Sequence, residues 1–229
     1  MSIAKQYNEF ADDFSGSVDN SLVSRIQFYK LLKKINLKQK FILDAGCGDG
    51  TDLVFYEEQG AIISGCDASE RLIKIAQERL PDRDIKVGLF ESLPFEDNQF
   101  DYVLSKYALQ TSEDIETSIQ EMVRVLKADG ELVFLTVHPL RQFMEKKSKH
   151  RDYYKQEKVG SVLFKGSIVA EEPSHTFSEY FSSSILKKLQ LLEIYEGSDF
   201  ADTSAQQVNG DYYPTFLICR FKKIINLYE

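Results

Sequence analysis

The chain has 229 residues, of which 36 are acidic and 28 are basic, and its formal net charge is −8. Hydrophobic residues make up 43% and charged residues 28%, ordinary values for a globular protein that exclude collagen-like, wholly disordered and disulfide-dense classes. At about 150 residues per domain, this length predicts a single domain, 1–229, with an elaboration.

The cysteines and the net charge restrict the classes of partner. Cys47, Cys66 and Cys219 form no C-x-x-C pair, so we expect neither a disulfide framework nor a metal site. A negative chain has no generic attraction for nucleic acid or anionic lipid. The sequence contains no run of about 18 apolar residues and does not begin with the apolar centre of a secretory signal, which predicts a soluble, cytoplasmic protein. We therefore expect a small-molecule partner, and a monomer or homodimer.

Residues 1–36 are predicted to form a helical cap that covers the edge or the mouth of a sheet. An aromatic segment comes first, with Tyr7, Phe10 and Phe14. A second amphipathic segment opens at Asn20 or Ser21. The apolar residues expected to share one of its faces are Leu22, Ile26, Tyr29 and Leu32.

Residues 37–138 alternate short apolar runs with helical periods, which is typical of β-α-β units around a parallel sheet. The predicted strands are 41–45, 62–66, 85–87, 102–104 and 132–137. A helix is predicted to begin near Thr51, and Ser69 is placed to cap another over 70–80, which Pro81 ends. The clearest helical period covers 115–126.

After Pro139 the pattern changes. Residues 139–180 form a polar insertion, expected on the substrate side, with one strand-like stretch at 162–169. Residues 181–229 predict a terminal helix, through Phe181, Ile185, Leu186 and Leu189, followed by strands at 191–195 and 215–221. No low-complexity linker marks a domain boundary.

The loop after the first predicted strand carries the most information. Asp44 ends the strand, and Gly46, Gly48 and Gly50 follow at alternate positions. Glycines at this spacing allow a sharp turn with positive φ and let a ligand lie against main-chain N–H groups. A dinucleotide fingerprint would have its last glycine at Thr51, and no G-K-[ST] phosphate loop follows. The next strand leads to Asp67, where a carboxylate can accept both hydrogen bonds of a ribose diol, so the pattern indicates a nucleoside site.

Four segments between Asp44 and Val137 stand in the order found in one family: DAGCGDG, CDAS, ESLPFEDNQFDYVLS and EMVRVLKADGELVF. The chain thereby resembles the class I S-adenosylmethionine-dependent methyltransferases. The resemblance implies an α/β protein, a Rossmann-like three-layer α/β/α sandwich whose seven-stranded sheet is mostly parallel with one antiparallel strand. It also implies S-adenosyl-L-methionine as the cofactor and S-adenosyl-L-homocysteine as its product.

The resemblance assigns cofactor contacts to Tyr7, Asp44, Ala45, Gly46, Cys47, Gly48, Asp67, Ala68, Leu72, Phe90, Glu91, Ser92 and Ser105. In that assignment Asp67 holds the ribose. Two positions depart from the family pattern. Leu89 stands where relatives commonly place an Asp that accepts from the adenine amine, which shifts that role to Glu91 or a main-chain carbonyl. Gln110 stands where many relatives have His.

Methyl transfer from a sulfonium is an in-line displacement, so holding the acceptor about 3–3.5 Å from the methyl carbon provides most of the catalysis. It requires no metal and no covalent intermediate. A general base matters only for a protonated acceptor, and His138 and His175 are the candidates. Each has a structural alternative: a bond to the adjacent loop for His138 and a cap or exposed loop for His175. The aromatic residues that would wall an acceptor pocket, or belong to the core instead, are Tyr107, Tyr180, Tyr212 and Tyr213.

Transfer to a small molecule is the function that we favour from the sequence, and two alternatives remain. A basic segment, 146–158, interleaves lysines with Tyr153 and Tyr154, which is a pattern that binds single-stranded nucleic acid, so an RNA- or protein-modifying methyltransferase is the first. A cofactor-binding module without catalysis is the second.

Overall fold

A computed structural model describes residues 2–15, 21–163, 168–199 and 213–225. The strands are β1 (Phe41–Ala45), β2 (Ile62–Asp67), β3 (Asp84–Val87), β4 (Phe100–Lys106), β5 (Leu126–Val137), β6 (Lys158–Leu163), β7 (Ile168–Pro173), β8 (Leu189–Gly197) and β9 (Phe216–Lys223). The helices are α1 (Ile3–Phe14), α2 (Val23–Leu32), α3 (Thr51–Glu58), α4 (Glu70–Arg79), α5 (Ile115–Val125), α6 (Pro139–Glu145), α7 (Phe177–Tyr180) and α8 (Ser183–Leu186), with a 3-10 turn at Leu109–Thr111.

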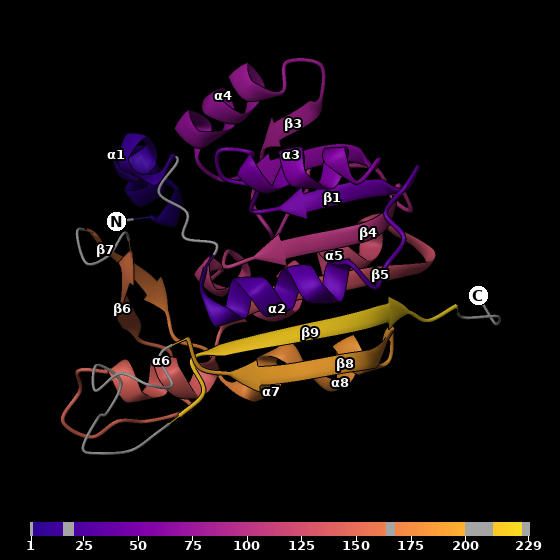
Figure 1. The fold of residues 1–229 in the computed structure, drawn as a ribbon. Helices are drawn as coiled ribbons and strands as arrows, with labels where there is room; N and C mark the ends of the chain where they lie inside the picture. The colour runs from indigo at the N-terminus through magenta and orange to yellow at the C-terminus, as the bar shows by residue number, and fades with distance from the viewer. Residues whose placement is uncertain (1, 16–20, 164–167, 200–212, 226–229) are drawn as a thin grey trace.

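Seven of these strands form one sheet in the order β3-β2-β1-β4-β5-β9-β8. All neighbours pair in parallel except at β9, which runs antiparallel to both β5 and β8. The predicted Rossmann-like sheet with one antiparallel strand is therefore confirmed. Successive strands are added on one side of β1 up to β3 and then on its other side from β4 onward. Open α/β sheets bind ligands at such a reversal of strand order, in the crevice beyond the carboxyl ends of the two strands, here β1 and β4. In Figure 1 both arrowheads point to the left, toward α1 and the β6–β7 pair.

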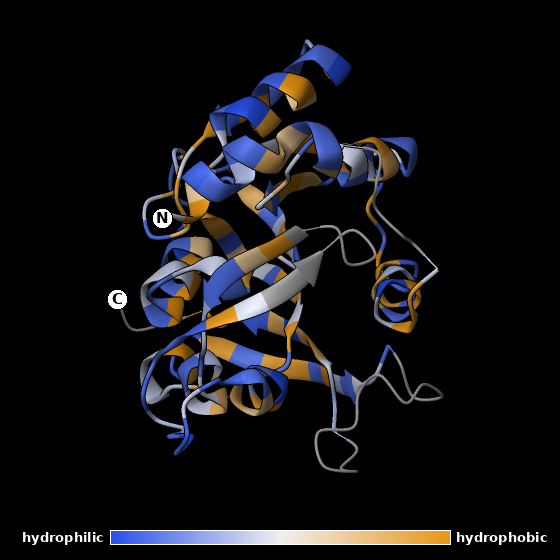
Figure 2. Cartoon of the chain, turned by 90° about the vertical axis from the view of Figure 1, so that its left-hand side faces the viewer, coloured by the Kyte–Doolittle hydropathy of each residue, from blue (hydrophilic) through white to orange (hydrophobic). Residues whose placement is uncertain are grey.

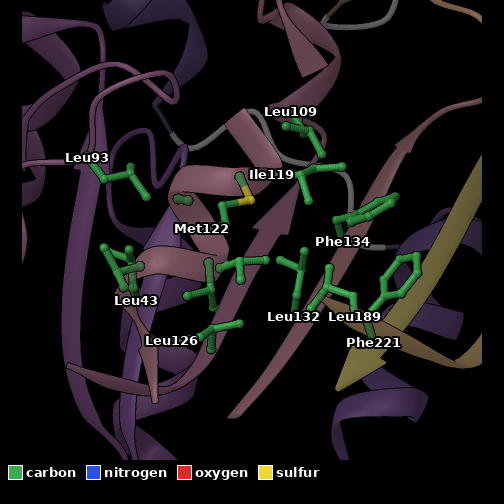
Figure 3. Packing of buried hydrophobic residues seen from close by; sticks show 14 of the residues in the cluster. Leu43, Leu93, Leu109, Ile119, Met122, Leu126, Leu132, Phe134, Leu189 and Phe221 are labelled. Atoms are coloured by element: carbon green, nitrogen blue, oxygen red, sulfur yellow. The ribbon is translucent and has the colours of Figure 1, made fainter. Parts of the chain in front are cut away.

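Two hydrophobic layers sandwich the sheet. On one face α5, α7 and α8 pack through residues such as Ile119, Met122 and Ile185, and Figure 3 shows how closely this layer is filled. On the other face α2, α3 and α4 contribute, among others, Phe28 and Leu53. Figure 2 views the carboxyl edge of the sheet and shows helices that carry both apolar and polar residues, as amphipathic packing on a sheet requires. None of the described helices combines the length and apolarity needed to cross a membrane.

Local signals for the helices of the core behave as predicted. The Ser69 hydroxyl accepts from the Leu72 N–H at 3.2 Å and caps α4. At α5, Asp114 accepts from the Thr117 N–H at 3.0 Å. Such caps fix where a helix starts, so α4 and α5 begin at the expected residues. Helix α3 begins at Thr51 as expected, after Gly50, which has positive φ and provides no side-chain cap.

The face predicted for the second N-terminal helix is only partly correct: Leu32 is buried and Tyr29 packs against the same cluster, but Ile26 does not. In α2 the buried apolar residues are Phe28, Leu31 and Leu32, whereas Ile26 is 40% exposed. The segment is apolar on more than one face, so its periodicity alone left the orientation open. Packing against the cluster below β1 selected the Phe28 face.

The tail also differs from its prediction in two places. The stretch expected as one strand at 162–169 is divided between the antiparallel strands β6 and β7. Within the expected helix from Phe181 to Leu189 only the single turn α8 forms, another single turn, α7, precedes it and ends at Tyr180, and Leu189 already begins β8. Ser182 caps the second turn, accepting from the Ile185 N–H at 3.4 Å, and so interrupts the first.

Candidate functional site

A cavity of about 480 Å³ lies beyond the carboxyl ends of β1, β2 and β4, and its volume falls in the range typical of small-molecule sites. Its walls come from α1, the glycine loop, the end of β2, the loop after β3 and the segment after β4. The residues that line it are Ser2, Ile3, Ala4, Tyr7, Phe14, Gly46, Gly48, Cys66, Asp67, Ala68, Ser69, Leu72, Gly88, Leu89, Phe90, Glu91, Leu93, Lys106, Tyr107, Ala108, Thr111, Ser112, Glu113 and Asp114.

The glycine loop forms the floor of this cavity. Gly46 has φ +82°, and a Cβ at this position would lie 2.2 Å from the Ala108 Cβ, so only glycine fits. The N–H groups of Gly46 and Cys47 donate to the Cys66 carbonyl at 2.7 and 3.0 Å. The Gly48 N–H donates to Asp67. The expectation that a ligand bonds to these N–H groups is therefore corrected: the loop permits close approach, but these three donors are already used within the chain. Such a floor suits a flat, uncharged surface better than a phosphate.

Asp67 is the main polar group of the cavity. Its two oxygens accept the N–H groups of Gly48, at 3.0 Å, and Ser69, at 2.8 Å. A carboxylate has about four acceptor positions, so capacity remains for a ribose diol. Burial raises the pKa of Asp67, and the hydrogen bonds from Ser69 and Gly48 oppose that rise.

The remaining walls at this end are mostly apolar. Ala68 and Leu72 of the β2–α4 junction face the cavity, as do Leu89 and Phe90 of the loop after β3. Above them, α1 supplies Tyr7 and Phe14, whose ring centroids are 6.0 Å apart. A slot between apolar walls with an acid at one edge fits an adenosine, with the base between the walls and the ribose at Asp67.

Five residues that the sequence assigned to the cofactor do not line the cavity. They are Asp44, Ala45, Cys47, Ser92 and Ser105. Among the described residues the Asp44 Oδ2 and Ser105 Oγ atoms are buried without a hydrogen-bond partner. Burial, with the nearby Asp52 carboxylate, raises the pKa of Asp44 well above its usual range. These two groups lie beneath the loop, at the ends of β1 and β4, where a polar ligand group would give them a partner.

A buried ion pair next to the cavity was not predicted from the sequence. Lys106, the last residue of β4, lines the cavity and contacts both oxygens of Asp52 at 2.6 and 2.7 Å. The Tyr29 hydroxyl bonds to the same acid and lies 2.9 Å from the Lys106 Nζ. Burial lowers the pKa of Lys106, while Asp52 counters that effect. The sequence did contain one indication of a role for Lys106. It directly follows Ser105, a residue already assigned to the cofactor.

The two candidate histidines lie outside the residues that line the cavity. His138 caps α6: its Nδ1 accepts the Leu140 N–H at 3.0 Å, and its Nε2 lies 2.7 Å from Glu196. The His175 Nε2 lies 3.1 Å from the Gln110 carbonyl, and its side chain is fully buried. The contact of His138 with the adjacent Leu140 agrees with its structural alternative, a bond to the neighbouring loop. His175 is neither the cap nor the exposed loop residue of its alternative, because its buried ring contacts the Gln110 carbonyl and Thr176 caps α7.

The aromatic candidates separate in space. Tyr107 lines the cavity, whereas Tyr180 is buried in the core, with its hydroxyl 3.4 Å from that of Thr136. Tyr213 is partly buried, near the side chains of Glu145 and Arg141, and does not line the cavity. Tyr212 lies outside the described residues.

Comparison with known proteins agrees with this geometry. Residues 43–134 match the model of a family described as a methyltransferase domain. A demethylmenaquinone methyltransferase from Thermotoga maritima is 30% identical over 137 residues, which are 60% of this chain and 59% of that protein. Malonyl-acyl-carrier-protein O-methyltransferase 1 from Coxiella burnetii is 33% identical over 129 residues, 56% of this chain and 43% of that protein. An S-adenosylmethionine-dependent methyltransferase structure from Mesorhizobium loti aligns with a TM-score of 0.69 and 20% identity, covering 89% of this chain and 99% of that one.

Residues 43–134 thus match a methyltransferase domain, and the whole fold is similar to that of an S-adenosylmethionine-dependent methyltransferase structure. The chain spans less than two thirds of the length of the two curated relatives named above. What it binds and which acceptor it modifies therefore have to be argued from its own site.

Proposed function

We propose that this protein binds S-adenosyl-L-methionine in the cavity at the carboxyl edge of the sheet and transfers its methyl group to a small molecule. The observation that carries the proposal is that Asp67 lies beside the glycine loop, which has no side chains at Gly46 and Gly48. An acid with spare acceptor capacity lies beside a surface that Gly46 keeps open, and apolar walls face each other across the slot.

In this proposal Asp67 accepts from the ribose hydroxyls, and the adenine lies between Leu72 and Phe90. The amino-acid part of the cofactor runs along Gly46 toward the buried Asp44 and Ser105. The bound cofactor supplies a methyl group that its sulfonium charge has already activated. The residues after β4, Tyr107 above all, then border the space left for the acceptor.

The contribution of the protein to the rate is positional. Helix α1 covers the cavity and is held near its middle from two sides. Gln6 exchanges two hydrogen bonds with the backbone of Glu171, at 2.9 and 3.0 Å, and the Asn8 side chain accepts from the Ser69 hydroxyl at 2.7 Å. A covered site excludes water and restricts the acceptor to in-line approach. Because His138 and His175 lie away from the cavity, the proposal includes no histidine base.

A small acceptor is favoured over RNA by the basic segment itself. The Lys146 ammonium is buried and donates to the carbonyls of Asp152 and Lys155 at 2.6 and 2.5 Å. Lys158 pairs with Glu113. These cations stabilise the insertion, which leaves fewer of them for a phosphate backbone. The two curated relatives are named for acceptors other than nucleic acid, a demethylmenaquinone and a malonyl group on acyl-carrier protein.

Calorimetry with S-adenosyl-L-homocysteine tests the cofactor part of this proposal. We expect binding by the wild type and at least tenfold weaker binding by Asp67→Asn, because charge-assisted hydrogen bonds contribute about 1.5–3 kcal/mol. The matched control is Asp84→Asn, an exposed acid at the start of β3, which should bind normally. Binding of nicotinamide dinucleotide in place of the homocysteine nucleoside would refute the assignment.

Transfer of a labelled methyl group tests the acceptor part. The protein is incubated with S-adenosyl-L-methionine carrying the label and with separate metabolite, RNA and protein fractions. Label that enters the metabolite fraction, and does so less with Asp67→Asn, would support the proposal. Label confined to RNA or protein would contradict it.

A further inference from the structure

Arg25, in the first turn of α2, is partly buried and forms no ion pair with any residue that the structure describes. Its Nε and Nη1 atoms are buried and have no hydrogen-bond partner among the described residues. The contact that holds the guanidinium is the face of the Tyr107 ring, whose centroid is 5.9 Å away. Burying an unpaired cation is costly, so such a group calls for an explanation in a native structure.

The nearby acids are already engaged. Asp199 accepts the Ser24 N–H at 2.7 Å, the Ser24 hydroxyl at 2.9 Å and the Tyr107 hydroxyl at 3.0 Å. Asp52 is bound by Lys106 and Tyr29. Neither acid forms an ion pair with Arg25, so the guanidinium has no negative partner among the described residues.

The other cations around Tyr107 do have partners. Lys106 pairs with Asp52, and Arg141, which faces Tyr107 from α6, pairs with Glu145 at 2.8 Å. Arg25 therefore differs from both neighbours in having no acid of its own within the described residues.

Arg25 is not itself among the residues that line the cavity, but it contacts Tyr107, which does line it. Tyr107 and Lys106, its two immediate neighbours, line that cavity after β4. Tyr107 has φ +52°, and its N–H donates to the Leu135 carbonyl at 2.7 Å, which fixes the ring at the strand end. Figure 1 shows the start of α2 at the same edge of the sheet to which the arrowheads of β1 and β4 point.

From this arrangement we propose that the methyl acceptor carries a carboxylate and that Arg25 binds it against the ring of Tyr107. The inference rests on the proposed function and adds the chemical class of the acceptor. The planar guanidinium matches the two oxygens of a carboxylate and can stack on an aromatic face at the same time. A carboxylate supplies the partner that the described residues do not provide, and a neutral acceptor would leave the cation without one.

The test uses the full chain loaded with S-adenosyl-L-homocysteine. Ligand-observed NMR measures the affinity of three carboxylates, propionate, malonate and benzoate, each beside its uncharged amide. We expect at least one carboxylate to bind at least tenfold more tightly than its amide. Arg25→Gln should lower the affinity for that carboxylate at least tenfold. Lys30→Gln, which removes an exposed cation from the same helix, should change this affinity less than twofold.

Nucleoside binding separates the two proposals. If no variant or wild-type protein binds S-adenosyl-L-homocysteine, the proposed function fails. If the nucleoside binds with equal affinity to wild type and Arg25→Gln, the fold and the cofactor site of the variant are intact. The measured affinities for the carboxylates and amides then decide whether Arg25 binds a carboxylate. Equal binding of acids and amides, an unaffected Arg25→Gln variant, or no binding of any carboxylate would each overturn the inference about Arg25.

Discussion

At the scale of single residues, the site depends on an acid that still has free hydrogen-bond acceptor positions. Asp67 has one chain N–H on each oxygen, which orients the carboxylate without saturating it. Asp49, by contrast, is bound by the Thr51 and Ser15 hydroxyls and by Arg79, and is not among the residues that line the cavity. Two buried acids of the same region thus have different roles because of their partners.

The raised pKa of Asp67 predicts that cofactor affinity depends on pH. The ionised carboxylate is the form that accepts from a diol, so affinity should be highest above its pKa and fall as the pH is lowered through it. Because burial raises that pKa, the fall should begin at a higher pH than for an ordinary Asp, whose pKa is about 3.9. Calorimetry with S-adenosyl-L-homocysteine over a pH series measures this. In Asp67→Asn the affinity should no longer fall at low pH. A fall that persists in this variant would mean that another group titrates.

Gly46 allows a second prediction at this scale. Gly46→Ala should lower both stability and nucleoside affinity, since the new methyl group meets the Ala108 Cβ and the backbone has positive φ. Gly60→Ala is the control: it has a similar φ of +83°, but its new neighbour is the flexible Lys38 side chain. Adding Ala108→Gly should restore part of the loss at Gly46 alone. Thermal unfolding and calorimetry would show this, and a double variant no better than Gly46→Ala would exclude the clash.

At the scale of elements, α5 organises a wall of the cavity from outside it. The Arg124 guanidinium donates to the carbonyls of Leu93 and Phe95 at 3.0 and 2.8 Å and pairs with Glu121 and Asp97. It thereby ties the loop after β3, which presents Leu89 and Phe90 to the cavity, to a helix of the core. The order of that wall depends on an element that never contacts the ligand.

Arg124→Ala should therefore loosen the adenine wall. Because the side chain is 30% exposed, we expect a loss of only about 1–2 kcal/mol of stability, for carbonyls that lose a charged donor. That corresponds to a melting temperature lower by about 2–8 °C for a chain of this size. Nucleoside affinity should fall as well. Arg83→Ala, which removes a surface pair with Glu57, should affect neither property strongly. If the two variants bind the nucleoside equally well, Arg124 has no part in ordering the wall.

At the scale of the whole molecule, the cavity joins segments that are distant in sequence. Helix α1 contacts α4 on one side and β7 on the other, and the glycine loop lies beneath it. A ligand in the cavity would touch several elements at once and would favour the folded state by mass action.

S-adenosyl-L-homocysteine should therefore stabilise the entire fold. At a free concentration one hundred times its Kd the expected gain is about 2.7 kcal/mol, or about 5–11 °C in melting temperature. Nicotinamide dinucleotide at the same concentration should produce no such shift, and Asp67→Asn should show a smaller one. Thermal unfolding followed by circular dichroism would measure all three, and an equal shift with both ligands would argue against a specific S-adenosyl-L-homocysteine site.

The sequence by itself determined the order of the core elements, the glycine turn and the place of Asp67, because these follow from short-range rules: strand and helix periods, caps, and positive φ at glycine. It did not determine the buried face of α2, the division of 162–169 between two strands, or the network of Lys106, Asp52 and Tyr29. Those depend on which surfaces meet. Only the tertiary structure decided that His138 and His175 join chain segments and do not line the cavity, and that Arg25 of the N-terminal cap lies against Tyr107 with no ion pair to a described acid. Contacts between residues dozens of positions apart are fixed by packing and not by local pattern.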